Sequence, residues 1–182
     1  MRQLMLLRHA KTEKDSPTGN DRDRRLNTRG REDAPAIGRY IADHELAPQL
    51  VLVSPAVRAR ETSDLVAAEL AIEAPHEIVP DLYGADPSEL LKVVRSAARS
   101  AARRTPERVM IVGHNPGLHE FALALVKTGD AKSRRALQEN LPTGGLVIVS
   151  FSITQWADLT FGGGRLERLV SPALLRQESD ES

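Results

Sequence analysis

The chain has 182 residues with 25 basic and 25 acidic side chains, so its formal net charge is zero. This balance excludes a nucleic-acid binder held by bulk charge, and the lack of cysteine excludes disulfides, thiolate metal sites and cysteine nucleophiles. Hydrophobic residues make up 41% of the chain, which is ordinary for a globular protein. No apolar run approaches the roughly 20 residues that cross a bilayer, and no signal sequence is evident, so we expect a cytoplasmic protein.

Short apolar runs and helix-like spacings alternate along the chain. The runs predict strands buried on both faces, at Leu4–Leu7, Leu50–Val53 and Val109–Val112. Apolar residues at three- and four-residue spacing predict helices at Glu32–Glu45, Pro55–Leu70, Pro87–Arg103 and Gly117–Lys127. Further strands are predicted near residues 76–80 and at Leu146–Phe151, Trp156–Phe161 and Leu166–Val170, with a hairpin turn at Gly162-Gly163-Gly164. The alternation predicts an α/β fold with parallel strands.

The length fits one domain better than two. We expect a single domain over residues 1–172, followed by a polar, flexible tail over residues 173–182. The loop from Lys11 to Arg25 is polar and contains Gly and Pro, and it is too short to form a cap domain. A site beside this loop is therefore expected to be open.

Arginine and histidine side chains follow each of the first three predicted strands along the same edge. Arg8 and His9 end the first strand, and His114 follows the third. After the second strand, Ser54 suits the N-cap of a helix whose first turn carries Arg58. Arg60 is the alternative ligand on this helix, but the Arg-Ala-x-x-Thr spacing favours Arg58. Because ligands bind at the carboxyl ends of parallel strands, these side chains are expected to converge. Guanidinium groups and helix N-termini match phosphate oxygens, so the edge is predicted to bind a phosphoryl group.

The motifs Leu7-Arg8-His9, Ser54-Pro55 with Arg58-Ala59 and Thr62, and Gly113-His114 together resemble the histidine phosphatase superfamily. The segments Arg24–Gly30 and Leu141–Gly144 are similar to those of its SixA-like branch. The resemblance covers roughly residues 2–172, with the motifs in the family's order. It implies a phosphoglycerate-mutase-like fold, which is a three-layer α/β/α sandwich with a mostly parallel central sheet.

The resemblance also implies roles for the site residues. His9 would be the nucleophile that becomes transiently phosphorylated, while Arg8, Arg58 and His114 would bind the phosphoryl oxygens. The chemistry of these residue types agrees, because a neutral imidazole carries a lone pair and nearby guanidinium groups favour the neutral ring. A cationic set of this kind can hold the oxygens of a transferring phosphoryl group by itself, so no metal and no cofactor are expected. The five-residue separation of His114 and His119 also misses the spacing of helical zinc ligands.

The proton donor for the leaving group is the open question. Mutase and acid-phosphatase branches place a carboxylate after a strand in the middle of the chain, and Asp81 is the nearest candidate here. SixA-like members resemble one another in lacking a firm acid at that place. A missing acid matters most for basic leaving oxygens, whereas the leaving nitrogen of a phosphoramidate can carry its own proton.

The resulting prediction is a metal-independent phosphatase, SixA-like, that acts on phosphohistidine in a protein. Two alternatives remain: a phosphatase for a small phosphate ester, and a non-catalytic phosphate-binding regulatory module. An intact nucleophile weighs against the module, because binding alone does not need one. Neither nucleic acid nor a membrane is an expected partner.

Overall fold

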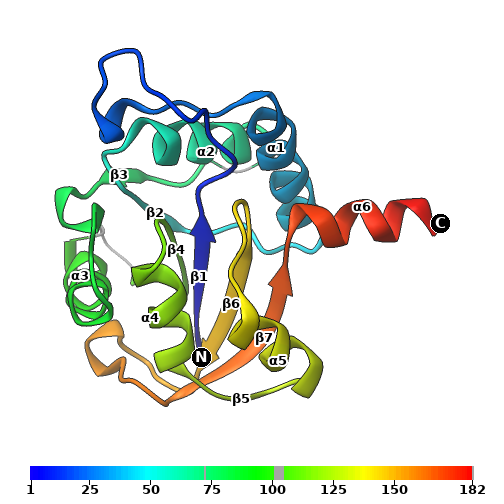
Figure 1. Cartoon of the computed structure of the whole chain (residues 1–182). Coiled ribbons are helices and arrows are strands. Elements are labelled where there is room, and N and C mark those ends of the chain that lie inside the picture. Colours follow the sequence, from blue (N-terminus) through cyan, green and yellow to red (C-terminus); the bar gives the residue numbers. More distant parts are fainter. Residues whose placement is uncertain (72, 101–104, 182) are drawn as a thin grey trace.

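The computed structural model describes residues 1–71, 73–100 and 105–181, and for residues 97–100 it describes the backbone only. The described residues form a seven-stranded sheet in the order β3-β2-β4-β1-β6-β7-β5 (Figure 1). The strands are β1 (Arg2–Arg8), β2 (Leu50–Val53), β3 (His76–Ile78), β4 (Arg108–Gly113), β5 (Val126–Gly129), β6 (Leu146–Phe151) and β7 (Gly164–Val170). Only β6 pairs antiparallel with its neighbours, β1 and β7. The predicted mostly parallel α/β sheet is confirmed.

Helices cover both faces of the sheet and make three layers (Figure 1). Helices α1 and α2 pack on one face, while α3, α4 and α5 pack on the other. Their bounds are α1 (Thr28–Asp43), α2 (Val57–Ala67), α3 (Pro87–Ser100), α4 (Gly117–Leu125) and α5 (Ala131–Glu139). Short 3₁₀ turns are η1 (Asp21–Asp23), η2 (Pro80–Leu82) and η3 (Trp156–Asp158). The predicted three-layer sandwich is confirmed.

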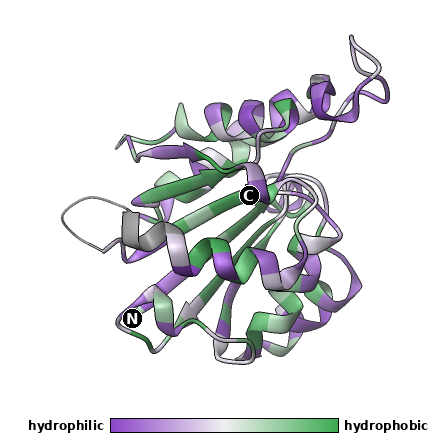
Figure 2. Cartoon of the chain, turned by 90° about the vertical axis from the view of Figure 1, so that its left-hand side faces the viewer, coloured by the Kyte–Doolittle hydropathy of each residue, from purple (hydrophilic) through white to green (hydrophobic). Residues whose placement is uncertain are grey.

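The central strands are apolar on both faces because each face meets a helical layer. In β1, Leu4 and Leu6 belong to the core under α3 and α4, whereas Met5 and Leu7 belong to the core under α1 and α2. All four side chains are fully buried, and burial of each such side chain stabilises the fold by about 1.5–3 kcal/mol. Figure 2 shows the hydrophobic strands enclosed between more polar helices. This double burial explains why the sequence shows continuous apolar runs.

Two predicted helix starts differ from the observed ones. Helix α1 begins at Thr28 rather than Glu32, because the Asn27 side chain caps it by accepting a hydrogen bond from Gly30 N at 2.9 Å. Helix α2 begins after Ala56, which makes no side-chain cap bond, so Ser54 is not its N-cap. Helix α3 begins as predicted, but its predicted end at Arg103 lies outside the described residues.

The chain between β6 and β7 contains no strand within its described residues, so the predicted strand at Trp156–Phe161 is wrong. Trp156 instead begins η3, where its buried indole donates a hydrogen bond to Pro106 O at 2.7 Å. The glycines at 162–164 therefore do not form a tight hairpin turn, and Gly164 already belongs to β7. Strand β5 and helix α5 were not predicted, because their sequences are rich in polar residues and lack a clear periodicity.

The predicted flexible tail begins as a helix. Helix α6 (Pro172–Asp180) starts at an N-cap, Ser171, whose side chain accepts from Leu174 N. It is tied to α1 by an ion pair between Arg176 and Asp33 at 2.7 Å. The division into a domain over 1–172 and a flexible tail stays a prediction.

A substitution at Gly117 tests how closely the start of α4 packs against the backbone before α3. A Cβ at this position, the start of α4, would lie 1.9 Å from Ala85 O. Gly117→Ala should therefore push the backbone before α3 away and lower the free energy of unfolding by about 1–3 kcal/mol. Urea denaturation measures this change. Gly113→Ala is the matched control, because its Cβ would meet nothing closer than 3.8 Å, and an equal loss in both variants would contradict the packing account.

Candidate active site

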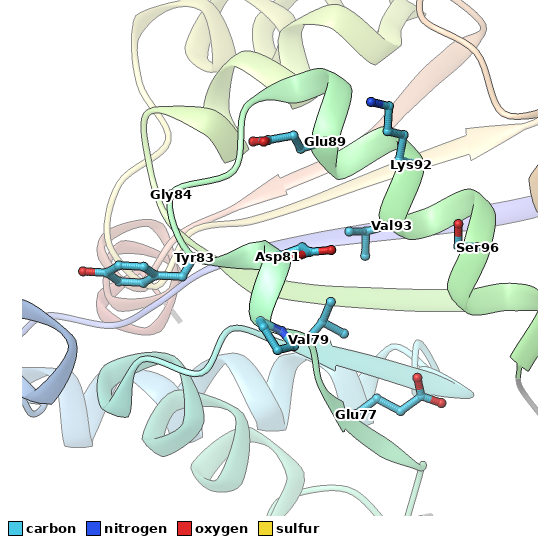
Figure 3. Close-up of a pocket in the computed structure, with 10 residues that line it drawn as sticks. Glu77, Val79, Asp81, Tyr83, Gly84, Glu89, Lys92, Val93 and Ser96 are labelled. Carbon is cyan, nitrogen blue, oxygen red and sulfur yellow. The ribbon is translucent and has the colours of Figure 1, made fainter.

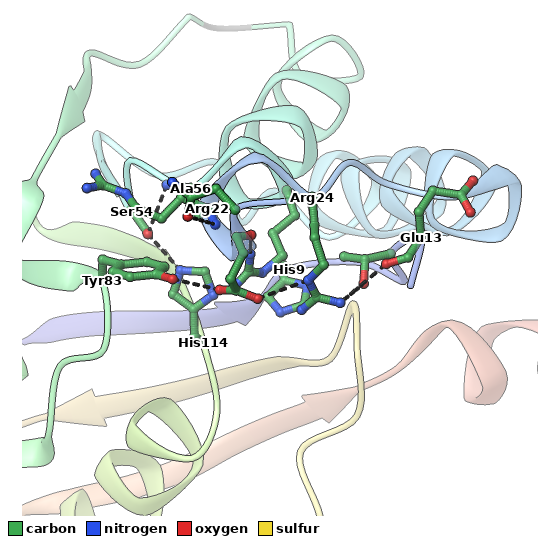
Figure 4. A network of polar contacts seen from close by, with 12 residues as sticks. His9, Glu13, Arg22, Arg24, Ser54, Ala56, Tyr83 and His114 are labelled. Carbon is green, nitrogen blue, oxygen red and sulfur yellow. Dashed lines mark hydrogen bonds and ion pairs between the residues drawn. The ribbon is translucent and has the colours of Figure 1, made fainter. Parts of the chain in front are cut away.

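The structure brings together the side chains predicted to converge at one edge of the sheet. Arg8 ends β1, His9 follows it, Arg58 lies in the first turn of α2, and His114 follows β4. The two imidazole rings lie with their centroids 5.3 Å apart. Figure 4 shows His9 and His114 within one network of polar contacts. Strand ends that are far apart in the sequence therefore form one cationic site.

Backbone contacts fix the position and the tautomer of His9. Its Nδ1 lies 2.8 Å from Ala10 O, and because a carbonyl oxygen only accepts, Nδ1 carries the hydrogen. The neutral ring then bears its lone pair on Nε2. Thr62 holds the same segment, accepting from Ala10 N at 3.0 Å and donating to Arg58 O at 2.7 Å. The spacing Arg58-Ala-x-x-Thr62 thus ties the first strand end to α2.

The pKa of His9 is lowered to about 3. Burial is the largest cause, since it disfavours the charged ring, and the nearby positive charges act in the same direction. The hydrogen bond to Ala10 O opposes these effects only in part. His9 is therefore an uncharged imidazole at neutral pH, with a lone pair available for attack.

A turn from the other end of the sequence holds Arg8. Leu141 O accepts hydrogen bonds from Arg8 Nη1 at 3.0 Å and from Asn115 Nδ2 at 2.8 Å. Gly144 N donates to the carbonyls of both Arg8 and His9. Gly144 adopts a φ of 70°, a conformation that suits glycine, so the turn before β6 depends on it. The segment picked out by resemblance at 141–144 is therefore a clamp on the first strand end.

His114 is held from the second strand end. Its Nε2 lies 2.6 Å from Ser54 Oγ, and the Tyr83 ring packs edge-on against it with centroids 5.6 Å apart. Burial, followed by the charge of Arg58, lowers the pKa of His114 to about 4, which makes this ring neutral as well. Ser54, predicted as a helix cap, is thus part of the site.

Three buried nitrogen atoms of the site have no hydrogen-bond partner among the residues that the structure describes. They are Arg8 Nε, Arg58 Nε and His114 Nδ1. Buried polar atoms normally find a partner, so a cluster of unmatched ones marks a place for a ligand. Guanidinium Nε groups only donate, which makes an oxyanion the matching ligand.

Asp21 is a site residue that sequence reasoning missed. Its backbone and side-chain oxygens accept from Arg58 Nη1 at 2.7 Å and Nη2 at 3.0 Å, and Tyr83 donates to the same carboxylate at 2.6 Å. The hydrogen bond from Tyr83, reinforced by those from Arg58 and Arg24, holds the pKa of Asp21 well below its ordinary value. Asp21 is thus ionised. No motif or spacing in the sequence marks it, because it reaches the site through the fold of a polar loop.

Because of this contact, the loop over residues 11–25 lies closer to the site than the sequence predicted. The sequence predicted a loop that leaves the site open, but η1 places Asp21 directly on Arg58. Arg24 supports the arrangement by donating to Asp21 Oδ1 at 3.0 Å and to Thr12 Oγ1 at 3.0 Å. The loop therefore forms one wall of the site.

Asp81, the predicted general acid, lies beside the site rather than within the polar network. It is exposed in a groove of about 760 Å³ that is lined by residues from β3 to α3. Figure 3 shows the Asp81 carboxylate and the Tyr83 ring pointing in opposite directions. Within the described part of the chain, Asp81 forms no hydrogen bond or ion pair. Its role as an acid stays a prediction.

The described residues contain neither a metal-binding cluster nor a membrane-spanning helix. No group of three or more His, Cys, Asp or Glu side chains there is arranged to hold a metal ion. His119, five residues after His114, is instead bonded through Nε2 to Leu137 O. Nor is any helix in the described ranges both long and apolar enough to span a membrane.

Comparisons with known proteins agree on one family. Residues 4–84 match the sequence profile of the histidine phosphatase superfamily (branch 1). An uncharacterized protein of Mycobacterium leprae is 32% identical over 168 residues, which cover 88% of this chain and 96% of the relative. Two solved structures are similar over 94% of this chain, both described as putative phosphohistidine phosphatases SixA. The structure from Nakamurella multipartitia has a TM-score of 0.79 and 26% sequence identity, and 96% of its own chain is covered. The structure from Agrobacterium tumefaciens has a TM-score of 0.75 and 27% sequence identity, and 98% of its own chain is covered.

Asp21→Asn tests the electrostatic effect of the loop on the site. The amide keeps an oxygen acceptor for Arg58 but removes a negative charge, so inorganic phosphate should bind more tightly by about 3- to 10-fold. Isothermal titration calorimetry at low salt measures the affinity. Asp23→Asn is the matched control, because it removes the same charge from the same loop without touching Arg58. Equal affinities in the two variants would contradict a specific Asp21–Arg58 effect.

Proposed function

Because this chain is a phosphatase that belongs to the histidine phosphatase superfamily (branch 1), we propose that His9 takes the phosphoryl group from the substrate as a covalent intermediate. One observation carries the proposal. The hydrogen bond from His9 Nδ1 to Ala10 O leaves the Nε2 lone pair free, on a ring that burial keeps neutral. No base is needed to activate such a nucleophile.

Arg8, Arg58 and His114 would bind the phosphoryl oxygens in this scheme. All three residues act electrostatically on His9, and each has a buried nitrogen atom without a partner among the described residues that can donate to an oxyanion. Charge on a transferring phosphoryl group is spread over its equatorial oxygens, and fixed donors in a buried site stabilise it strongly. The side chains of this chain can do so without a metal, so we propose metal-independent catalysis.

The reaction would proceed in two steps. First, the Nε2 lone pair attacks phosphorus, the N–P bond forms, and the bond to the leaving group breaks with its electrons passing to the leaving atom. Second, water attacks the phosphorus, the N–P bond breaks, and the electron pair returns to Nε2 as phosphate leaves. The proton that water loses passes to phosphate or solvent.

We further propose that the leaving group is the imidazole of a phosphohistidine in another protein. Asp21, a carboxylate within the polar network, has a lowered pKa and is ionised, so it has no proton to donate. Asp81 points away from Tyr83, the residue whose ring contacts His114. An alkyl ester would suffer from this lack of an acid, whereas a leaving nitrogen can carry its own proton. The likeness to structures described as SixA phosphohistidine phosphatases supports the same substrate class.

The groove beside Tyr83 favours a second candidate. Its volume of about 760 Å³ falls in the range of small-molecule sites, so it could hold the organic part of a small phosphate ester. In that case Asp81 would face the bound substrate and could serve as the acid. For both substrate candidates, we propose that the protein acts in the cytoplasm and binds neither nucleic acid nor a membrane.

His9→Ala tests the nucleophile. The variant should lose at least about 10³-fold in turnover, because no other side chain replaces the lone pair, while inorganic phosphate still binds to the arginines. Steady-state kinetics and calorimetry measure the two quantities. His76→Ala changes an exposed histidine and serves as control. Turnover by His9→Ala near the wild-type rate would exclude His9 as the nucleophile.

A leaving-group series separates the two substrate candidates. Rates for aryl phosphates should fall steeply as the pKa of the leaving group rises, and a phosphohistidine protein should react faster than an alkyl phosphate at equal concentration. Asp81→Asn should leave this dependence unchanged. A flat series in the wild type that becomes steep in Asp81→Asn would instead identify Asp81 as the acid and favour small esters.

A further inference from the structure

Ser54 has a buried hydroxyl that the proposed reaction does not use. It follows β2, its backbone N donates to Val112 O at 3.0 Å, and its side chain is fully buried. The hydroxyl oxygen lies 2.6 Å from His114 Nε2 and 3.3 Å from Ala56 N. The residue therefore connects the start of α2 to the ring of His114.

The hydrogens of these groups can be assigned by asking what each can donate. Ala56 N–H can only donate, so the Ser54 oxygen accepts from it. The hydroxyl hydrogen then needs an acceptor, and within the described residues the one in contact is His114 Nε2. If Nε2 donated instead, the buried hydroxyl hydrogen would have no acceptor, a loss that is normally avoided. Matching each donor at Ser54 to an acceptor therefore assigns the lone pair of His114 to Nε2.

This assignment fixes what His114 presents to the site. A neutral imidazole has one hydrogen, and burial together with Arg58 lowers the pKa of His114 enough to keep the ring neutral. With a lone pair on Nε2, the hydrogen lies on Nδ1, the atom that is buried and lacks a partner among the described residues. His114 thus offers a donor, as an oxyanion requires.

His9 and His114 are then the same Nδ1–H tautomer, but they present different ring nitrogens to the site. His9 gives its Nδ1 hydrogen to Ala10 O and presents a bare Nε2. His114 accepts at Nε2 from Ser54 and presents its Nδ1 hydrogen. One ring can therefore attack phosphorus while the other binds an oxygen, although both have the same protonation state.

We propose that Ser54 is a positioning residue, which holds His114 in the Nδ1–H tautomer so that its ring donates to a phosphoryl oxygen. The inference rests on the proposed role of His114 as a phosphoryl ligand. Ser54 acts through His114 and does not itself touch the phosphoryl group. Without the hydroxyl, the ring is free to move its hydrogen to Nε2 and to turn a lone pair toward the anion, which would repel it.

The experiment reads the tautomer directly. Long-range ¹H–¹⁵N correlation spectra of the imidazoles at neutral pH distinguish protonated from bare ring nitrogens, and His114→Ala identifies the signals. The wild type should show a protonated Nδ1 and a bare Nε2 on His114. Ser54→Ala should move His114 toward the Nε2–H form and weaken inorganic phosphate binding by about 10-fold, the size expected for one hydrogen bond to a charged group.

Two controls separate this effect from a general disturbance. The His9 signals should not change in Ser54→Ala, because Ala10 O still holds that ring. Ser63→Ala removes another buried hydroxyl from α2, one without contact to His114, and should leave the tautomer and the affinity unchanged. A wild-type His114 with a protonated Nε2, or a Ser54→Ala variant with the wild-type tautomer, would overturn the proposal.

The readouts do not depend on turnover. If His9 proved not to be the nucleophile, the tautomer of His114 and the phosphate affinity of Ser54→Ala would still be measurable. Failure of the proposed reaction and failure of the Ser54 assignment are therefore distinguishable.

Discussion

Burial beside two arginines is the constraint on which the site depends. It lowers the pKa of both His9 and His114, so that neither ring adds a third positive charge to the edge of the sheet. A protonated His9 has no lone pair on Nε2 and could not attack phosphorus. The electrostatic environment thus supplies a ready nucleophile from an ordinary imidazole.

Hydrogen bonds that involve the backbone hold His9 and the arginines in the positions on which this electrostatic environment depends. Thr62 ties Ala10 to α2, Leu141 O holds the Arg8 side chain, and Gly144 N donates to the carbonyl oxygens of both Arg8 and His9. These contacts join the first strand end to two distant segments, helix α2 and the turn over residues 141–144. A site built on strand ends in this way is more rigid than one built on loops, which suits a reaction that depends on the alignment of Nε2 with phosphorus.

The sequence predicted the framework of the site and missed its wall. Arg8, His9 and His114 could be located because each follows an apolar strand, and burial on both faces gives such strands an unmistakable pattern. Asp21 could not be located, because it reaches Arg58 through an irregular loop whose course depends on contacts such as that between Arg24 and Thr12. Ser54 was identified but given the wrong partner, since N-cap preference is a local rule and His114 lies 60 residues away. The strand expected at Trp156 failed for the same kind of reason, as its indole bonds to Pro106.

The central claim is that the phosphoryl group passes through His9. Rapid-quench experiments with a protein carrying ³²P-labelled phosphohistidine test it most directly, followed by mapping of the label. The account predicts a burst of acid-labile, alkali-stable label on the phosphatase, located in the peptide that contains His9. Turnover without any enzyme-bound label, or label on a residue other than His9, would contradict it.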